Sequence, residues 1–163
     1  MKIKHIHRTT LIDYPGKIAC TIFLYGCNFR CSFCHNPELV IREEGKDMQE
    51  EEIISFLQER KKYLDGICIT GGEPLLTLEE DFLRKVKALG YLIKLDTNGS
   101  FPDKLEDFIN KQLIDFISMD VKSCKEKYGQ VAGKDVDVDK IEKSMQIIIN
   151  SGLDYEFRST IVE

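Results

Sequence analysis

Residues 18–34 read IACTIFLYGCNFRCSFC, and this stretch joins a short apolar run to a loop that carries three cysteines. The apolar run, residues 18–25, is rich in β-branched and aromatic side chains, which predicts a buried strand. It is far shorter than the roughly 18 apolar residues that indicate a membrane span. The cysteines have the spacing C-x₃-C-x₂-C and begin two positions after the run. The stretch therefore predicts a metal-binding loop at the end of a strand.

Four more runs of this kind follow and predict further strands, over residues 66–70, 91–95, 116–121 and 155–162. Helical patterns separate these runs. Strands that alternate with helices pair in parallel through right-handed crossovers, and the helices cover the sheet. The fold class is therefore predicted to be α/β. No internal repeat or linker interrupts the pattern, so we expect residues 1–163 to form a single domain.

The helices have readable ends. Asp47 and Thr77 each precede a glutamate by three residues, as in a capping box, and predict two helix starts. The first helix is expected to reach residue 64, and the second to end at Gly90, because glycine tolerates the left-handed conformation that ends many helices. Two shorter helices are expected over residues 102–109 and 139–152, the latter with an apolar face of Ile141, Met145, Ile148 and Ile149.

The composition excludes several classes of protein. The net charge is −5 and no cluster of Lys or Arg is present, so nucleic acid is not an expected partner. With 42% hydrophobic and 31% charged residues the chain resembles a folded globular protein. No signal for export or for a membrane is found, so we expect a cytoplasmic protein whose cysteines stay reduced. Cys20, Cys68 and Cys124 are then interpreted as small buried hydrophobic residues.

The remaining cysteines, Cys27, Cys31 and Cys34, are the candidate metal ligands. A structural zinc site is normally closed by four ligands, and His35 is the only local candidate for the fourth. A [4Fe–4S] cluster accepts four thiolates, so three would leave one iron with an open position for a substrate. The spacing favours the cluster, and a zinc-stabilised binding module without catalysis stays as an alternative. No role is assigned to His35.

Unusual residues also follow the other predicted strands. In α/β sheets the loops at the carboxyl ends of the strands build the active site, so these motifs should meet at one edge. In the motif after the second strand, paired glycines let backbone approach a ligand, and a carboxylate suits an ammonium group. The candidate binding residues are Gly71, Gly72, Glu73 and Pro74 in GGEP, Asp96 and Asn98 in DTNG, Asp120 and Lys122 in MDVK, and Arg158.

The segment CNFRCSFC resembles the signature of radical S-adenosylmethionine (SAM) enzymes, in which an aromatic residue, here Phe33, precedes the third cysteine. The GGEP segment matches a second motif of that superfamily. The resemblance implies that the open iron of a [4Fe–4S] cluster binds the amino and carboxylate groups of SAM, and that the backbone at Phe33 lies against the adenine. It implies an open, partial parallel (β/α) barrel with about five strands.

The DTNG motif and the D-x-K of MDVK resemble those of the glycyl-radical-enzyme activating branch. That resemblance implies that Asp96 and Asp120 hold a monovalent cation near the methionine carboxylate, which Lys122 or Arg158 neutralises. From residue 10 onward the sequence is most similar to anaerobic ribonucleoside-triphosphate reductase activating proteins. It stops before the sixth strand of those proteins, so we expect the C-terminal part of the barrel to be missing.

This resemblance implies a reaction and partners. One-electron reduction of the cluster, with flavodoxin or ferredoxin as donor, would cleave SAM to methionine and a 5′-deoxyadenosyl radical. The radical would remove hydrogen from a glycine of a partner, expected to be anaerobic ribonucleoside-triphosphate reductase. The catalytic residues would be Cys27, Cys31 and Cys34 as cluster ligands. An alternative in the same superfamily is an enzyme that acts on a small molecule, such as 7-carboxy-7-deazaguanine synthase.

Overall fold

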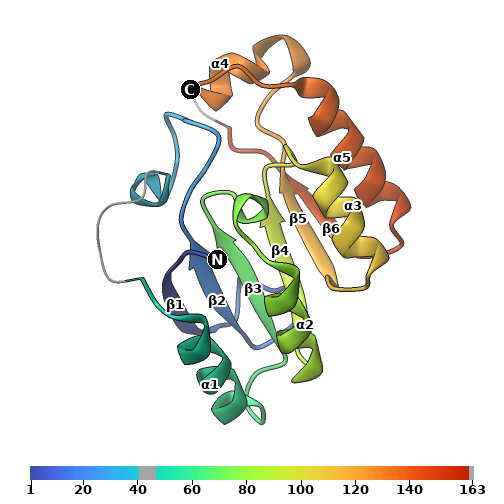
Figure 1. The fold of residues 1–163 in the computed structure, drawn as a ribbon. Coiled ribbons are helices and arrows are strands. Elements are labelled where there is room, and N and C mark those ends of the chain that lie inside the picture. The colour runs from blue at the N-terminus through green and yellow to red at the C-terminus, as the bar shows by residue number, and fades with distance from the viewer. Residues whose placement is uncertain (41–46, 162–163) are drawn as a thin grey trace.

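The computed structural model describes residues 1–40 and 47–161 (Figure 1). It contains one sheet whose strands lie side by side in chain order. Strands β2 to β6 are parallel, and β1 pairs antiparallel with β2. The strands are β1 Ile3–Thr10, β2 Ala19–Leu24, β3 Gly66–Gly71, β4 Leu92–Thr97, β5 Phe116–Asp120 and β6 Asp154–Arg158.

The α/β class and the open parallel sheet are confirmed. All five predicted strands form, although β6 ends at Arg158, and Val162 at the end of the predicted fifth strand lies outside the described residues. The sheet has a sixth strand, β1, which the sequence pattern did not predict. Half of its residues are exposed, including His5 and His7, so it lacks the apolar pattern of a buried strand.

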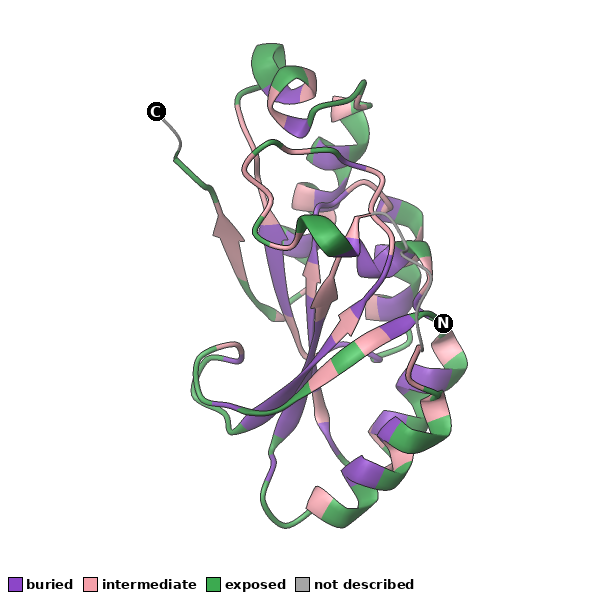
Figure 2. Ribbon diagram, turned by 90° about the vertical axis from the view of Figure 1, so that its left-hand side faces the viewer, coloured by how far each residue is buried: buried purple, intermediate pink, exposed green. Residues whose placement is uncertain are grey.

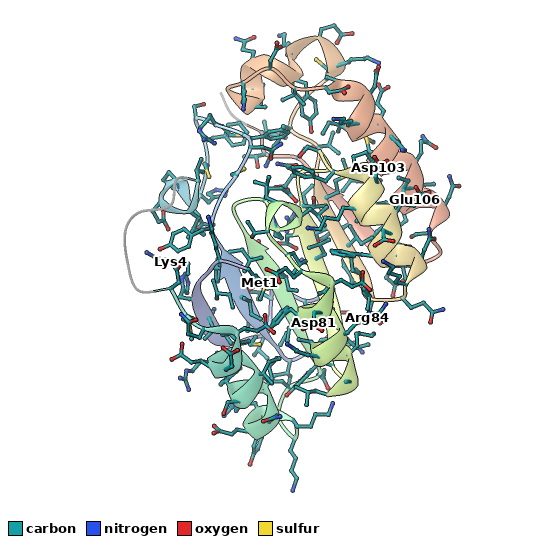
Figure 3. All side chains as sticks on the ribbon, in the orientation of Figure 1. Met1, Lys4, Asp81, Arg84, Asp103 and Glu106 are labelled. Carbon is teal, nitrogen blue, oxygen red and sulfur yellow. The ribbon has the colours of Figure 1, made fainter. Side chains whose placement is uncertain are left out.

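The helices lie along one side of the sheet (Figure 2). They are α1 Glu50–Arg60, α2 Glu80–Ala88, α3 Pro102–Asn110, α4 Tyr128–Ala132 and α5 Val138–Asn150, with single turns of 3₁₀ helix η1 Pro37–Leu39, η2 Pro74–Leu76 and η3 Lys125–Lys127. The buried residues of α2 are Phe82, Leu83 and Val86. Figure 3 shows Asp81 and Arg84 on α2, and both residues are exposed. α2 thus buries an apolar face, which is what holds it to the sheet.

The predicted helix starts needed correction. The capping box of α1 is formed by Gln49 and Glu52, so this helix starts at Glu50, and it ends at Arg60 rather than at residue 64. Thr77 ends η2, and α2 starts at Glu80 after Glu79. Thr77 was predicted to cap the start of α2, but it lies at the end of the short helix η2 instead.

Gly90 is confirmed as a left-handed residue after α2, with a φ of 78°. On α5 the predicted apolar face was partly wrong, because Ile149 is 46% exposed while Ser144 is buried. The Ser144 hydroxyl donates a hydrogen bond to the carbonyl oxygen of Gly99 at 2.6 Å, so a polar residue joins the buried face. Cys124 is exposed, which corrects its interpretation as a buried residue.

Cys20 and Cys68 are buried, as predicted. They point to opposite sides of the sheet: Cys20 packs in the apolar cluster under the helices, and Cys68 lines a cavity on the other side. None of the helices in residues 1–40 and 47–161 has the length and apolar character of a membrane span. The helix-free side of the sheet, at the carboxyl ends of its strands, is where the predicted site residues gather.

Candidate functional site

A cavity of about 480 Å³ opens on the helix-free side of the sheet. This volume lies within the range of about 300–1,000 Å³ that is common for small-molecule sites. Most of the predicted site residues line it. They are Cys27, Cys31, Phe33, Cys34, Gly71, Gly72, Asp96, Asn98, Asp120, Lys122 and Arg158. Glu73 and Pro74 do not line it and are buried.

The cysteine loop, residues 25–36, follows β2 and brings three free thiols to this cavity. The backbone N–H of Phe29 donates a hydrogen bond to Cys27 Sγ at 3.3 Å, and the N–H of Cys34 donates to the carbonyl of Cys31 at 3.2 Å. Burial raises the pKa of Cys27 to about 11. Among the described residues, no three or more His, Cys, Asp or Glu side chains are grouped closely enough to hold a metal ion.

The cysteine loop is held in place by contacts with the segment that contains α4. The N–H of Arg30 donates to the carbonyl of Ala132 at 2.7 Å. The rings of Phe29 and Tyr128 meet edge to face, with centroids 6.4 Å apart. A Cβ at Gly133, whose φ is 67°, would lie 2.2 Å from the carbonyl oxygen of Arg30. This close approach requires glycine, and it explains why a short unpredicted helix matters to the cysteine loop.

The GGEP turn packs against the start of the cysteine loop, backbone to backbone. The N–H of Gly72 donates a hydrogen bond to the carbonyl of Leu24 at 2.9 Å, and the N–H of Glu73 donates one to the carbonyl of Gly26 at 2.7 Å. A Cβ at Gly72 would lie 2.0 Å from the carbonyl oxygen of Gly26. The glycine therefore has a packing role that is independent of any ligand.

The Glu73 carboxylate is fully buried and binds groups of the chain itself. It accepts hydrogen bonds from Thr97 Oγ1 at 2.8 Å, from the N–H of Asn98 at 2.6 Å and from the N–H of Leu75 at 3.0 Å. Burial raises its pKa to about 7, although the three donors act in the opposite direction. Glu73 thus lies behind the cavity wall and connects the GGEP turn to the DTNG turn.

The DTNG turn also binds the cysteine loop, through a residue that the sequence reasoning did not single out. Asn28 Oδ1 accepts from Asn98 Nδ2 at 2.9 Å, and Asn28 Nδ2 donates to Ser100 Oγ at 2.8 Å. Ser100 Oγ in turn donates to Asn98 Oδ1 at 2.6 Å. These three side chains form a closed set of hydrogen bonds between two loops that are 70 residues apart in the sequence.

The opposite wall of the cavity, formed by the ends of β4, β5 and β6, is charged. Arg158 contacts Asp96 through Nη1 at 3.3 Å and Asp120 through Nε at 3.0 Å. Lys122 Nζ lies 2.8 Å from Asp120 Oδ2. Burial opposes the charge on Arg158, but the two carboxylates outweigh it and raise the pKa of the guanidinium. Lys94 also pairs with Asp96, and its Nζ lies 2.5 Å from Asp96 Oδ1.

Several further residues line the cavity that the sequence reasoning had not assigned to it. Asp13 accepts a hydrogen bond from Thr21 Oγ1 at 2.5 Å, and Cys68 lies deeper along the same side of the sheet. His35 lines the cavity as an exposed residue. Lys94 does not line the cavity, but it lies behind Asp96 and was also missed. Its signal was present, since a lysine within the apolar run LIKL needs an anionic partner when the strand is buried.

Phe33, the aromatic residue before the third cysteine, has its ring 5.9 Å from Lys122 Nζ. This contact joins the cysteine loop to the charged wall. Burial raises the pKa of Cys31, and the nearby Lys122 ammonium opposes that rise. Thiol, aromatic and charged groups from distant parts of the sequence therefore meet around one cavity.

Comparison with known proteins identifies the family to which the chain belongs. The model of the Radical SAM superfamily matches residues 21–162. A protein of Methanocaldococcus jannaschii, named as a candidate glycyl-radical enzyme activating enzyme, is 39% identical over 146 residues, which cover 85% of this chain and 58% of that protein. The pyruvate formate-lyase-activating enzyme of Clostridium pasteurianum is 33% identical over 140 residues, 82% of this chain and 58% of the enzyme.

A third relative, the 7-carboxy-7-deazaguanine synthase of Methanospirillum hungatei, is 38% identical over 107 residues, 63% of this chain and 42% of the synthase. The chain thus spans little more than half the length of the first two relatives and less than half of the third.

Solved structures agree on the fold. Native anSMEcpe with bound AdoMet superimposes with a TM-score of 0.63 at 19% identity, over 82% of this chain and 40% of that one. QueE from Escherichia coli superimposes with a TM-score of 0.55 at 13% identity, over 98% of this chain and 94% of that one. With a family model that covers most of its length, the chain belongs to the radical SAM superfamily.

Proposed function

We propose that this chain forms the cofactor-binding and radical-generating part of a glycyl-radical-enzyme activase. The observation that carries the proposal is the meeting of Cys27, Cys31 and Cys34 with the GGEP and DTNG turns around one cavity. The two relatives that match most of the chain, at 39% and 33% identity, both carry activating-enzyme names. The match covers 58% of the length of each relative, so the activity of the whole enzyme is a proposal for this chain.

A [4Fe–4S] cluster and SAM are the cofactors that membership of the superfamily implies. The donor set fits them, because the three thiols are free and line a common space. In such a cluster each cysteine ligates a different iron, so the sulfurs must surround a volume and need not converge on one ion. Family membership also favours this cluster over the zinc interpretation.

Two groups of the chain favour the thiolate form and partly oppose the effect of burial on the thiol pKa values. The Phe29 N–H that donates to Cys27 Sγ stabilises negative charge on that sulfur, and the ammonium of Lys122 acts in the same sense on Cys31. When bound and reduced by an external one-electron donor, the cluster would pass that electron to the sulfonium of SAM, so that cleavage would give methionine and a 5′-deoxyadenosyl radical able to remove hydrogen from a glycine Cα. The residues of this chain bind and orient the reactants.

SAM would lie between the two walls of the cavity. Gly71 and Gly72 bring backbone close to a ligand at the end of β3. Lys122 and Arg158 provide cationic donors for a carboxylate on the opposite side. Glu73 holds the wall in place instead of facing the ligand, since its oxygens bind Leu75, Thr97 and Asn98.

The partner is proposed to be anaerobic ribonucleoside-triphosphate reductase. The test is to reduce the reconstituted chain, add SAM and the reductase from the same source, and record electron paramagnetic resonance spectra. A glycyl signal, with deuterium transfer from labelled glycine into 5′-deoxyadenosine, is the expected result. SAM cleavage without a glycyl signal would contradict the assignment of this partner.

Cysteine variants separate the proposed ligands from the other thiols. Cys31→Ala should abolish cluster formation and SAM cleavage. The matched control is Cys124→Ala, because Cys124 is exposed and does not line the cavity. Equal losses in both variants would contradict the assignment of the ligand loop.

A second candidate is a radical SAM enzyme that acts on a small molecule. The 38% identity to the synthase of Methanospirillum hungatei, over 107 residues, favours it. The two candidates differ in what stimulates the formation of 5′-deoxyadenosine. For the activase it should rise with the concentration of a protein partner, whereas the alternative predicts that a small-molecule extract, filtered to remove proteins, is sufficient.

A further inference from the structure

The charged wall of the cavity uses nitrogen cations of the chain to neutralise both of its aspartates. Asp96 Oδ1 lies 2.5 Å from Lys94 Nζ, and Asp96 Oδ2 lies 3.3 Å from Arg158 Nη1. Asp120 is paired in the same way. Its Oδ1 lies 3.0 Å from Arg158 Nε, and its Oδ2 lies 2.8 Å from Lys122 Nζ. Every carboxylate oxygen of the pair therefore has a cationic partner from the chain.

Lys94 makes this arrangement unusual. Its side chain is 2% exposed and extends from the middle of β4, with Cys68 Sγ 3.9 Å and the Phe116 ring 5.9 Å from Nζ. A buried ammonium is very costly unless a carboxylate pairs with it. The carboxylate of Asp96 is the partner that offsets the cost of burying the Lys94 ammonium.

Arg158 occupies the space between the two aspartates. One guanidinium binds Asp96 and Asp120 together, and its Nη1 lies 3.9 Å from Glu156 Oε1 as well. A metal cation that bridged Asp96 and Asp120 would have to approach this guanidinium. Two like charges at contact distance repel each other, and the partial burial of Asp96 and Asp120 limits the screening by water.

We propose that Lys94 and Arg158 are built-in counter-cations for Asp96 and Asp120, so that this chain binds SAM without a monovalent metal cation. The inference rests on the proposed function, because it concerns the same cavity. Lys94 and Arg158 are positioning residues in this role, because they fix the two carboxylates. Lys122 pairs with Asp120 Oδ2 but also lines the cavity beside Phe33, where its remaining N–H donors can meet an anionic group of the ligand.

The test compares SAM binding in different salts at one ionic strength. The full chain, reconstituted with its cluster, is titrated with SAM in NaCl, in KCl and in tetramethylammonium chloride, whose cation is too large for a carboxylate site. The dissociation constant should agree within twofold among the three salts. Binding at least fivefold tighter in NaCl or KCl than in tetramethylammonium chloride would overturn the proposal.

The variant Lys94→Met removes the internal cation and keeps a similar volume. It should bind SAM at least tenfold more weakly in tetramethylammonium chloride and regain part of that loss in NaCl or KCl. Lys94→Arg retains the charge and should stay independent of the salt. The matched control is Lys87→Met, because Lys87 also pairs with an aspartate, Asp115 at 2.8 Å, but lies on a helix outside the cavity.

A measurement without cofactors separates this inference from the proposed function. Chemical unfolding of the cluster-free protein should give the same stability in all three salts, whereas Lys94→Met should be stabilised by NaCl and KCl relative to tetramethylammonium chloride. Stabilisation of the unaltered protein by either alkali salt would overturn the inference. Failure to bind SAM in any salt, with unchanged salt independence of the cluster-free protein, would count against the proposed function alone. If Lys94→Met does not fold, the salt series on the unaltered chain still decides.

Discussion

The two walls of the cavity are built from different interactions. The turn wall, formed by the cysteine loop, the GGEP turn and residues 97–99 of the DTNG turn, is held by hydrogen bonds, three of which end on the buried carboxyl group of Glu73. The charged wall, formed by Asp96, Asp120, Lys122 and Arg158 with Lys94 buried behind Asp96, is held by ion pairs. Hydrogen bonds are directional and fix positions, whereas ion pairs set a potential and respond to salt. The first wall thus determines where a cluster would lie, and the second determines the charge that a ligand meets.

The largest loss of stability is expected at Gly72, where the turn wall has no space for a side chain. Gly72→Ala would place a Cβ 2.0 Å from the carbonyl oxygen of Gly26, so the GGEP turn and the cysteine loop would have to separate. We expect a loss of more than about 3 kcal/mol in the free energy of unfolding, measured by urea denaturation. The control is Gly16→Ala, where φ is 68° and no atom lies within 4 Å, so only backbone strain of about 1 kcal/mol should appear. Equal losses in the two variants would contradict the packing role of Gly72.

The second prediction concerns the buried anion of the turn wall. The Glu73 pKa is about 7 in the folded chain and near 4.5 when the residue is exposed to water. Between these values the native state holds a proton that the unfolded state has lost, so the free energy of unfolding falls as pH rises through this window. The full drop corresponds to about 3 kcal/mol.

Urea denaturation of the cluster-free protein at pH 5 and pH 8 measures this drop. Glu73→Gln should reduce the difference between the two pH values, because the variant has no carboxyl group to titrate. Glu106→Gln, at an exposed position of α3, should retain the pH dependence of the unaltered chain. An unchanged pH dependence in Glu73→Gln would show that another group is responsible.

The third prediction concerns the contact between the cysteine loop and the DTNG turn. Asn28→Ala removes the acceptor of Asn98 Nδ2 and the donor to Ser100 Oγ, which keeps only its bond to Asn98, and should cost about 1–2 kcal/mol in unfolding free energy. Asn28→Ala and Ser100→Ala should be non-additive in a double-mutant cycle, since both remove the same hydrogen bond. The control Asn150→Ala, at the exposed end of α5, should cost less. Additive losses would mean that Asn28 acts through other contacts.

What the sequence could predict differs between the walls. The three cysteines, the two glycine-rich turns and the parallel strands are local patterns, and each was recognisable from residue types and spacing. The partners of Glu73 were not, because a carboxylate in a turn gives no sign of whether it faces a ligand or the backbone of a neighbouring turn. The closure of Lys94 on Asp96 and of Arg158 on both aspartates likewise depends on tertiary packing.

β1 and α4 were missed for related reasons. β1 is an edge strand in which half of the residues are exposed, so its pattern lacks the apolar signal of a strand that is buried on both faces. α4 is one short turn whose importance comes from its contacts with the cysteine loop, and periodicity is not visible over 5 residues. Local patterns therefore predicted the parts of the site, and the tertiary structure determined which parts touch.

The smallest effect is expected from removal of the hydroxyl group of Tyr128, a residue that joins the two walls. Its ring meets Phe29 of the cysteine loop, and its hydroxyl contacts the N–H of Lys122 at 3.3 Å and the carbonyl of Asp120 at 3.4 Å. Both contacts are long, so Tyr128→Phe should cost at most about 1 kcal/mol, measured by urea denaturation beside the exposed control Tyr63→Phe. Tyr128→Ala also removes the packing of the ring and should cost about 3 kcal/mol or more. A small loss for Phe with a large one for Ala would mean that the walls are joined by aromatic packing, whereas similar losses would assign the connection to the hydroxyl.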